Sequence, residues 1–180
     1  MMPFLRITHP AGAFTADQKE KLAASLAYGV MAQELDPVTE NSIDATPVVF
    51  DEIALHNCFP GGRPLTRHPD KVFWIVEALV AAAFFDQAHR DALQAAVARS
   101  FVEVLGDDGS EVMRGDLRIS PAYLLRLYTV IVEIPEGSWG AGGRTIEVDQ
   151  IGQILGAGAG AERLAEAQEN AAKLKAARVS

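Results

Sequence analysis

The sequence predicts an α+β fold in which two tandem β-α-β units form a four-stranded mixed sheet with two helices on one face. Two observations lead to this prediction. The segments EIALHNCFPGGRP (52–64) and EIPEGSWGAGGRT (133–145) each begin with Glu-Ile and place Gly-Gly-Arg nine, ten and eleven residues after the glutamate. The same order of strand, helix and strand precedes each segment, so the chain contains an internal repeat.

The first repeat begins with a short strand over residues 4–9, where apolar and polar side chains alternate. Thr15 and Gln18 then form a capping box, which marks the start of a helix. Apolar residues continue that helix at helical spacing: Leu22, Leu26 and Val30. A second strand is predicted over residues 47–55, ahead of the first Gly-Gly-Arg.

The second repeat follows the same order. Residues 72–81 predict a strand, and Asp86 opens a helix that ends at Gly106. The apolar positions of this helix are Leu93, Val97, Phe101 and Val104. A last strand, predicted over residues 125–134, leads into the second Gly-Gly-Arg.

Two constant offsets in position number relate the repeats. An offset of 71 takes Thr15 to Asp86, whereas an offset of 81 takes Glu52 to Glu133. The difference of ten is explained by a polar insertion over 106–116, which we predict to be an exposed loop. We therefore expect residues 4–62 to superpose on residues 72–143.

The predicted topology leaves one face of the sheet uncovered. A β-α-β unit joins parallel strands by a right-handed crossover, so both helices lie on the same side. Strands such as residues 72–81 are apolar on both sides, and self-association is the simplest way to cover the second face.

The domain organisation follows from the repeat. We predict a single domain over residues 1–155, with repeats over about 3–64 and 72–145. Residues 145–151 alternate at Ile146 and Val148 and are predicted to pair with an edge strand. Residues 156–180 predict a C-terminal helical tail that is mostly solvated, and the alternative is a floppy low-complexity end.

Composition limits the function. A net charge of −8 over 180 residues, with no cluster of Lys and Arg, excludes nucleic acid as a partner. Cys58 is the single cysteine, which excludes an intrachain disulfide and a cysteine-based zinc site. We expect no membrane span, no cofactor and no metal site, and we predict a cytoplasmic protein that binds a small-molecule substrate.

These features together resemble the tautomerase superfamily, which includes 4-oxalocrotonate tautomerase and macrophage migration inhibitory factor. The resemblance covers about residues 3–146 and rests on Pro3, the capped first helix, the second strand ending in Glu-Ile, and EIPEGSWGAGG. It implies a homotrimer in which three four-stranded sheets enclose a barrel and the helices lie outside. That assembly would cover the bare face of the sheet.

The resemblance also implies that Pro3 is catalytic. An N-terminal proline is a secondary amine that can act as a general base, whereas the same nitrogen inside a chain is a non-basic amide. Because Met1 precedes the large Met2, a chain started at Met1 would keep both residues and block the amine. A start at Met2 would free Pro3. The alternative is a proline that only begins an edge strand.

Four further residues are candidates for substrate binding. The resemblance places Tyr128 where 4-oxalocrotonate tautomerases keep an arginine and migration inhibitory factor has a pocket tyrosine. Trp139 would line the pocket or plug the barrel mouth. Arg6 and Arg126 would hold a carboxylate or lie at the surface as ordinary cations. The arginine that precedes the capping box in the family is replaced by Phe14, and this argues against a dicarboxylate substrate.

Other residues have competing explanations. Glu52 and Glu133 could act as an acid–base pair, but their equivalent repeat positions favour an architectural role. Arg63 and Arg144 would bind loop carbonyls or pair with these glutamates. Residues 56–58 (His-Asn-Cys) could form a nucleophile pair, although the sequence supplies no third group to orient it.

Three functions follow. The first is a cofactor-free keto–enol tautomerase acting on a small 2-oxo acid or an aryl pyruvate, with Pro3 as the base. The second is a catalytically inactive protein of the same fold that binds a ligand or another protein. The third is hydration or decarboxylation through the same proline, which requires charged partners that the sequence does not identify.

Overall fold

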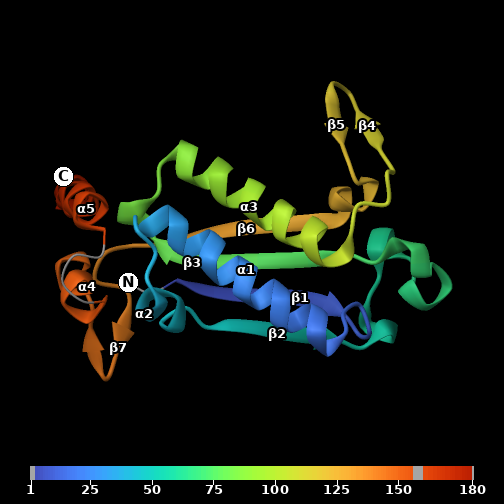
Figure 1. Ribbon diagram of the computed structural model, residues 1–180, viewed down its shortest axis with the longest axis horizontal. Coiled ribbons are helices and arrows are strands. Elements are labelled where there is room, and N and C mark those ends of the chain that lie inside the picture. Colours follow the sequence, from blue (N-terminus) through green and yellow to red (C-terminus); the bar gives the residue numbers. More distant parts are fainter. Residues whose placement is uncertain (1–2, 156–159, 180) are drawn as a thin grey trace.

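The computed structural model describes residues 3–155 and 160–179, and its centre is one four-stranded sheet (Figure 1). The strands are β1 (Phe4–Pro10), β2 (Val48–Ile53), β3 (Trp74–Ala81) and β6 (Leu127–Ile134), in the order β2-β1-β3-β6. Strands β1 and β2 are parallel, β3 and β6 are parallel, and β1 is antiparallel to β3. The predicted mixed sheet of two β-α-β units is confirmed.

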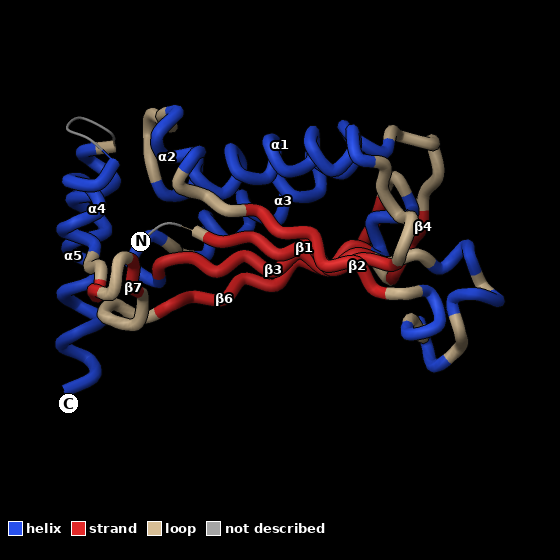
Figure 2. Tube along the Cα trace, turned by 90° about the horizontal axis from the view of Figure 1, so that it is seen from below, coloured by secondary structure: helices blue, strands red, loops and turns tan. Residues whose placement is uncertain are grey.

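Two long helices cover one face of this sheet (Figure 2). They are α1 (Ala16–Glu34) and α3 (Gln87–Leu105). The Thr15 and Gln18 capping box is present at the start of α1, and the Asp86 side chain caps α3 by accepting from the backbone of His89. Because capping depends on residues that are close in the sequence, both helix starts could be predicted from the sequence.

The repeat is present in three dimensions down to the register of the strands. Leu5 pairs with Val48, and moving these two positions by the sequence offsets of 71 and 81 gives Val76 and Thr129, which also pair. The first of these offsets also takes both ends of α1 to the ends of α3.

The glycines of the repeated motif also match. Gly61 and Gly142 have φ of 61° and 59°, and the glycines that follow them have φ of 74° and 76°. Both motifs therefore make the same left-handed turn, which favours glycine.

The connections between helix and strand differ between the repeats. The first repeat holds the short helix α2 (Glu40–Asp44). The second holds a hairpin of β4 (Val112–Arg114) and β5 (Leu117–Ile119), which forms its own sheet and projects from the body (Figure 1). The insertion predicted as an exposed loop is thus an ordered hairpin that extends past Asp116.

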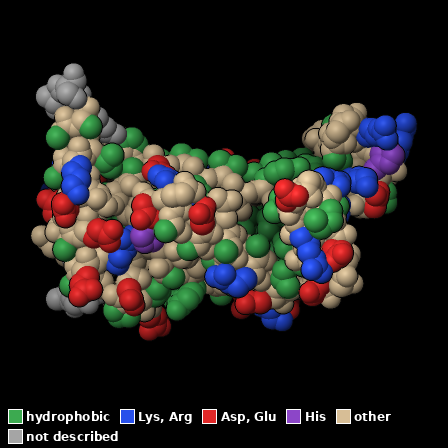
Figure 3. Space-filling model, turned by 90° about the horizontal axis from the view of Figure 1, so that it is seen from above, with side chains coloured by type: hydrophobic (Ala, Val, Ile, Leu, Met, Phe, Trp, Pro, Cys, Tyr) green, Lys and Arg blue, Asp and Glu red, His purple; other side chains and the backbone are tan. Residues whose placement is uncertain are grey.

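The hydrophobic core lies between the sheet and the two helices. Its fully buried members include Leu5, Ile7, Leu22, Val30, Val76, Leu93, Val97 and Phe101. No element among residues 3–155 and 160–179 covers the opposite face, which exposes Val49, Tyr128, Val130 and Val132. Figure 3 shows a hollow between two raised ends of the molecule, with hydrophobic side chains along it.

The segment after Arg144 is not a strand of the main sheet, contrary to the sequence prediction. A small hairpin of β7 (Gly140–Ala141) and β8 (Arg144–Thr145) precedes the helix α4 (Val148–Leu155). Val148 and Ile151 are both buried and lie three positions apart, which is the spacing of one face of a helix. The same short apolar run also fits the alternation of a strand, which is why a strand was predicted.

The helix α5 spans Ala161–Val179 and is mostly exposed, with Ala167 and Ala171 buried. It packs against α4 and the 3-10 helix η5 (Ala82–Phe84). The predicted boundary between residues 155 and 156 falls at residues 156–159, which are outside the described part. Within that described part, no helix is long and apolar enough to cross a membrane.

Candidate active site

Pro3 lies buried at one end of the sheet, immediately before β1. Phe4 pairs with Leu79 in the antiparallel partner strand, so Pro3 lies beside the carboxyl end of β3. Leu5 and Ile7 face the helices and are fully buried. Since side chains alternate along a strand, Pro3 faces the helices as well.

Several elements from the second half of the chain gather at this end (Figure 1). Trp139 follows β6 and is half-buried against the core, and its carbonyl accepts a 3.0 Å hydrogen bond from the backbone of Ile146. The helices α4 and α5 lie at the same end. Of the predicted substrate-binding residues, Trp139 is the one located at the same end of the sheet as Pro3.

Glu34, in the last turn of α1, is a buried acid that the sequence analysis missed. Only 1% of the residue is exposed, and Oε1 has no hydrogen-bond partner among the described residues. Burial raises the pKa of this carboxyl to about 7, and the backbone N–H of Ala81 and the charge of Arg163 only partly oppose that rise. Its signal in the sequence was a carboxylate continuing the four-residue spacing of Leu26 and Val30.

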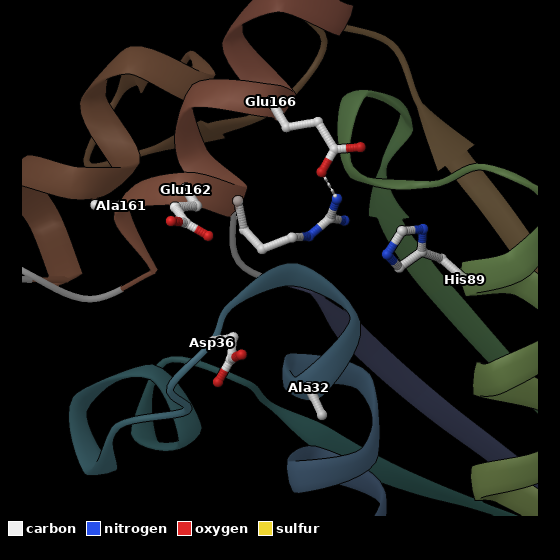
Figure 4. Close-up of a pocket in the computed structure, with 7 residues that line it drawn as sticks. Ala32, Asp36, His89, Ala161, Glu162 and Glu166 are labelled. Atoms are coloured by element: carbon white, nitrogen blue, oxygen red, sulfur yellow. Dashed lines mark hydrogen bonds and ion pairs between the residues drawn. The ribbon is translucent and has the colours of Figure 1, made fainter.

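Arg163 of α5 joins that helix to α1 and η5 at this end of the molecule. Its guanidinium donates to the carbonyls of Gln33 and Phe84, at 2.9 and 2.6 Å, and forms an ion pair with Glu166. A cavity of about 560 Å³ opens beside it, between α1, α3 and α5, and Figure 4 shows Asp36, His89 and Glu166 around that cavity. His89 hydrogen-bonds to Asp86, the cap of α3, so these contacts are structural.

Tyr128 and Arg126 lie at the opposite end of the sheet from Pro3. Tyr128 and Ile134 are six positions apart in β6, which corresponds to about 20 Å at the rise of a strand. Both side chains line a cavity of about 280 Å³, together with Phe59, Phe73 and Lys71.

This cavity is aromatic and cationic. Arg126 Nε donates to the carbonyl of Val72 at 2.8 Å, which fixes the guanidinium at the cavity. An adjoining cavity of about 360 Å³ adds Arg63 and His68. Lys71 was not predicted from the sequence and Arg63 was predicted to be structural, because the loop that brings them to the cavity at Arg126 folds through non-local contacts.

Arg6 lies on the uncovered face of the sheet. Its guanidinium is 3.8 Å from Glu77, and half of its side chain is exposed. It is three residues from Pro3 along β1 and points to the other side of the sheet. Within one chain, Arg6 therefore joins neither Pro3 nor the cavity at Tyr128.

The two glutamates of the repeat form equivalent ion pairs. Glu52 pairs with Lys19 at 3.1 Å, and Glu133 pairs with Arg90 at 2.5 Å. Lys19 and Arg90 occupy equivalent positions, because the offset between the two helices takes one to the other. Each pair ties the first turns of a helix to the end of the following strand, which is the architectural role. The alternative pairing with Arg63 and Arg144 is not observed.

Two further groups, Cys58 and an acidic cluster beside α4, are explained by burial and local bonding. Burial raises the pKa of the Cys58 thiol, and the thiol contacts backbone carbonyls, so a thiolate nucleophile is not favoured. Carboxylate oxygens of Glu136, Glu147 and Asp149 lie within 4.8 Å of one another. Glu136 caps the start of α4 and Glu147 pairs with Lys175, so local bonding accounts for this cluster.

Comparisons with known proteins identify the fold. No protein-family model matches the sequence, and no curated protein matches it significantly. A native fused 4-OT shares 22% identity over 79% of this chain and 94% of its own, with a TM-score of 0.60. A fused 4-OT described as an asymmetric trimer gives 19% identity with the same coverage and a TM-score of 0.57. Macrophage migration inhibitory factor of Toxoplasma gondii gives 15% identity over 79% of this chain and 99% of its own, with a TM-score of 0.54. The chain therefore has the same fold as fused 4-OT and macrophage migration inhibitory factor.

Proposed function

We propose that this protein is a cofactor-free keto–enol tautomerase that acts in the cytoplasm on a small 2-oxo acid or an aryl pyruvate. One observation carries the proposal. Pro3 is buried at the head of β1, beside the end of β3, in the fold that the chain shares with fused 4-OT and migration inhibitory factor.

The chemistry depends on a chain that begins at Pro3. The proline nitrogen is then a secondary amine, and desolvation at its buried position favours the neutral form that can accept a proton. The amine takes the proton from the enol hydroxyl as the C=O bond forms, and the resulting prolinium returns a proton to the substrate carbon. The net result is a shift of one proton from oxygen to carbon, with no external reactant.

The other half of the site comes from a neighbouring chain. Tyr128 and Arg126 lie at the opposite end of the sheet from Pro3, about 20 Å away along the strands, so one chain cannot bring both halves to a small substrate. The exposed apolar side chains of the sheet face, Tyr128 and Val130 among them, support burial in a homotrimer. A trimer with these faces inside would carry Tyr128 of one chain toward Pro3 of the next.

The cavity at Tyr128 indicates the substrate class. Phe59, Phe73 and Tyr128 offer aromatic surface, whereas Arg126 and Lys71 offer positive charge. An aromatic ring that carries one carboxylate satisfies both features. This favours an aryl pyruvate.

The test is the rate of enol-to-keto conversion of phenylpyruvate by a chain that begins at Pro3, verified by intact mass. Pro3→Ala should lower that rate by roughly 100-fold or more, because a positioned base contributes about this much. Some activity should remain, since alanine keeps a primary amine. An unchanged rate in the variant would remove the proline mechanism.

The second candidate is a binding protein without catalysis. It is favoured by one observation, which is that a single chain holds the cavity at Tyr128 apart from Pro3. A monomer would then bind an aromatic carboxylate without converting it. Light scattering that gave a monomer, together with saturable binding of phenylpyruvate and no turnover, would favour this candidate.

A further inference from the structure

The buried acid Glu34 has one carboxylate oxygen that no described hydrogen bond satisfies. It is 1% exposed, and its Oε1 lacks a hydrogen-bond partner among residues 3–155 and 160–179. Burying an unpaired carboxylate is unfavourable unless a charge or a donor meets it. A donor that the described hydrogen bonds do not include would account for this oxygen.

The register of the sheet points to Pro3 as that donor. Glu34 interacts with the backbone N–H of Ala81, at the end of β3. Extending the printed register of β1 and β3 by one residue places Pro3 opposite Val80, the neighbour of Ala81. Pro3 and Glu34 are both buried, and both lie at the carboxyl end of β3.

The second repeat shows that the fold does not need an acid at this place. The sequence offset of 71 equates Glu34 with Leu105, the last residue of α3, and equates Pro3 with Trp74. Leu105 packs against the hydrophobic core. The same architecture is therefore apolar where there is no proline and acidic where there is one.

We propose that Glu34 binds the amine of Pro3 and stabilises its protonated form during the reaction. This inference rests on the proposed function, because it requires a chain that begins at Pro3. A prolinium nitrogen has two N–H bonds. One donates to Glu34, and the other faces the substrate.

Glu34 keeps its negative charge through both proton transfers. When Pro3 takes the proton from the enol, its nitrogen becomes positive beside the carboxylate of Glu34, which lowers the energy of the ion pair. When Pro3 protonates the substrate carbon, the charge on nitrogen disappears and Glu34 remains a carboxylate. Arg163 of α5 and the N–H of Ala81 on β3 are the described groups that favour the ionised form of Glu34 against the effect of burial.

The experiment is a titration of the Pro3 amine without substrate. A chain that begins at Pro3, labelled with 15N-proline, is followed by NMR from acidic to basic pH. Glu34→Gln should lower the pKa of the amine by about one unit or more, because it removes an adjacent opposite charge. The matched control is Glu20→Gln on the exposed side of α1, which should leave the pKa unchanged.

A second variant keeps the test decisive if Glu34→Gln folds poorly. Glu34→Leu copies the second repeat at Leu105 and should fold well, with the same drop in the pKa of the amine. A pKa of Pro3 that stays the same in either folded variant would overturn the proposal.

The outcome separates this proposal from the proposed function. A lowered pKa of Pro3 in a protein that does not convert phenylpyruvate would support the pairing and contradict the tautomerase. Full conversion with an unchanged pKa in Glu34→Gln would contradict the pairing alone. If both hold, Glu34→Gln should also shift the pH profile of kcat toward lower pH, in step with the pKa measured by NMR.

Discussion

Replacing Glu34 by glutamine should stabilise the protein above neutral pH. The folded chain holds the proton of Glu34 more tightly than the unfolded chain, because burial raises its pKa from 4.5 to about 7. Stability therefore falls as pH rises through this range. The rise of about 2.5 units in pKa corresponds to about 3 kcal/mol of unfolding free energy, at about 1.4 kcal/mol per unit. This is an upper value, because pairing with a protonated Pro3 offsets part of it.

The assay is urea unfolding of the wild type, Glu34→Gln and Glu20→Gln at pH 4 and pH 8, at one protein concentration. We expect Glu34→Gln to exceed the wild type in unfolding free energy at pH 8 by up to about 3 kcal/mol and to match it near pH 4. Glu20→Gln should follow the wild type at both values. A wild type that gained stability relative to Glu34→Gln as the pH rose would refute this reasoning, since it would give the pKa shift the opposite sign.

Three further predictions concern the cavity, the sheet face and the repeat. Tyr128→Phe should slow phenylpyruvate conversion by at most about tenfold, since one hydrogen bond contributes about 0.5–1.5 kcal/mol; a much larger loss in steady-state kinetics would give Tyr128 a different role. Val130→Asp places a charge on the apolar sheet face and should convert a trimer to monomers by light scattering, whereas an unaffected trimer would show that this face is not the interface. Gly142→Ala should destabilise the fold by about 1–2 kcal/mol in thermal unfolding, because φ is +59° there, and an unchanged midpoint would contradict the left-handed turn.

The repeat was predictable because its signals are local. The capping box at Thr15, the cap at Asp86 and the glycines of the turn depend on near neighbours, and constant offsets then fix the register of both parallel pairs. The strand predicted for the segment from Ile146 to Ile151 was wrong, because a short apolar run suits both a strand and a helix. As a helix, this segment buries Val148 and Ile151 in the hydrophobic core.

The site was less predictable because it depends on long-range packing. Glu34 resembles an ordinary helix residue until α5 and the end of β3 enclose it. Lys71 reaches Arg126 only through the fold of the loop between β2 and β3. Pro3 and Trp139 were assigned by resemblance to the family. That resemblance could not show that Tyr128 lies at the opposite end of the sheet from Pro3 of the same chain.

The most direct test of the central claim compares two forms of the protein that differ only at the start of the chain. One begins at Pro3 and the other retains Met1 and Met2, and intact mass identifies each. We expect the first form to convert enol phenylpyruvate at least about 100-fold faster, because only there is the nitrogen of Pro3 a basic amine. Equal rates for the two forms would contradict the account.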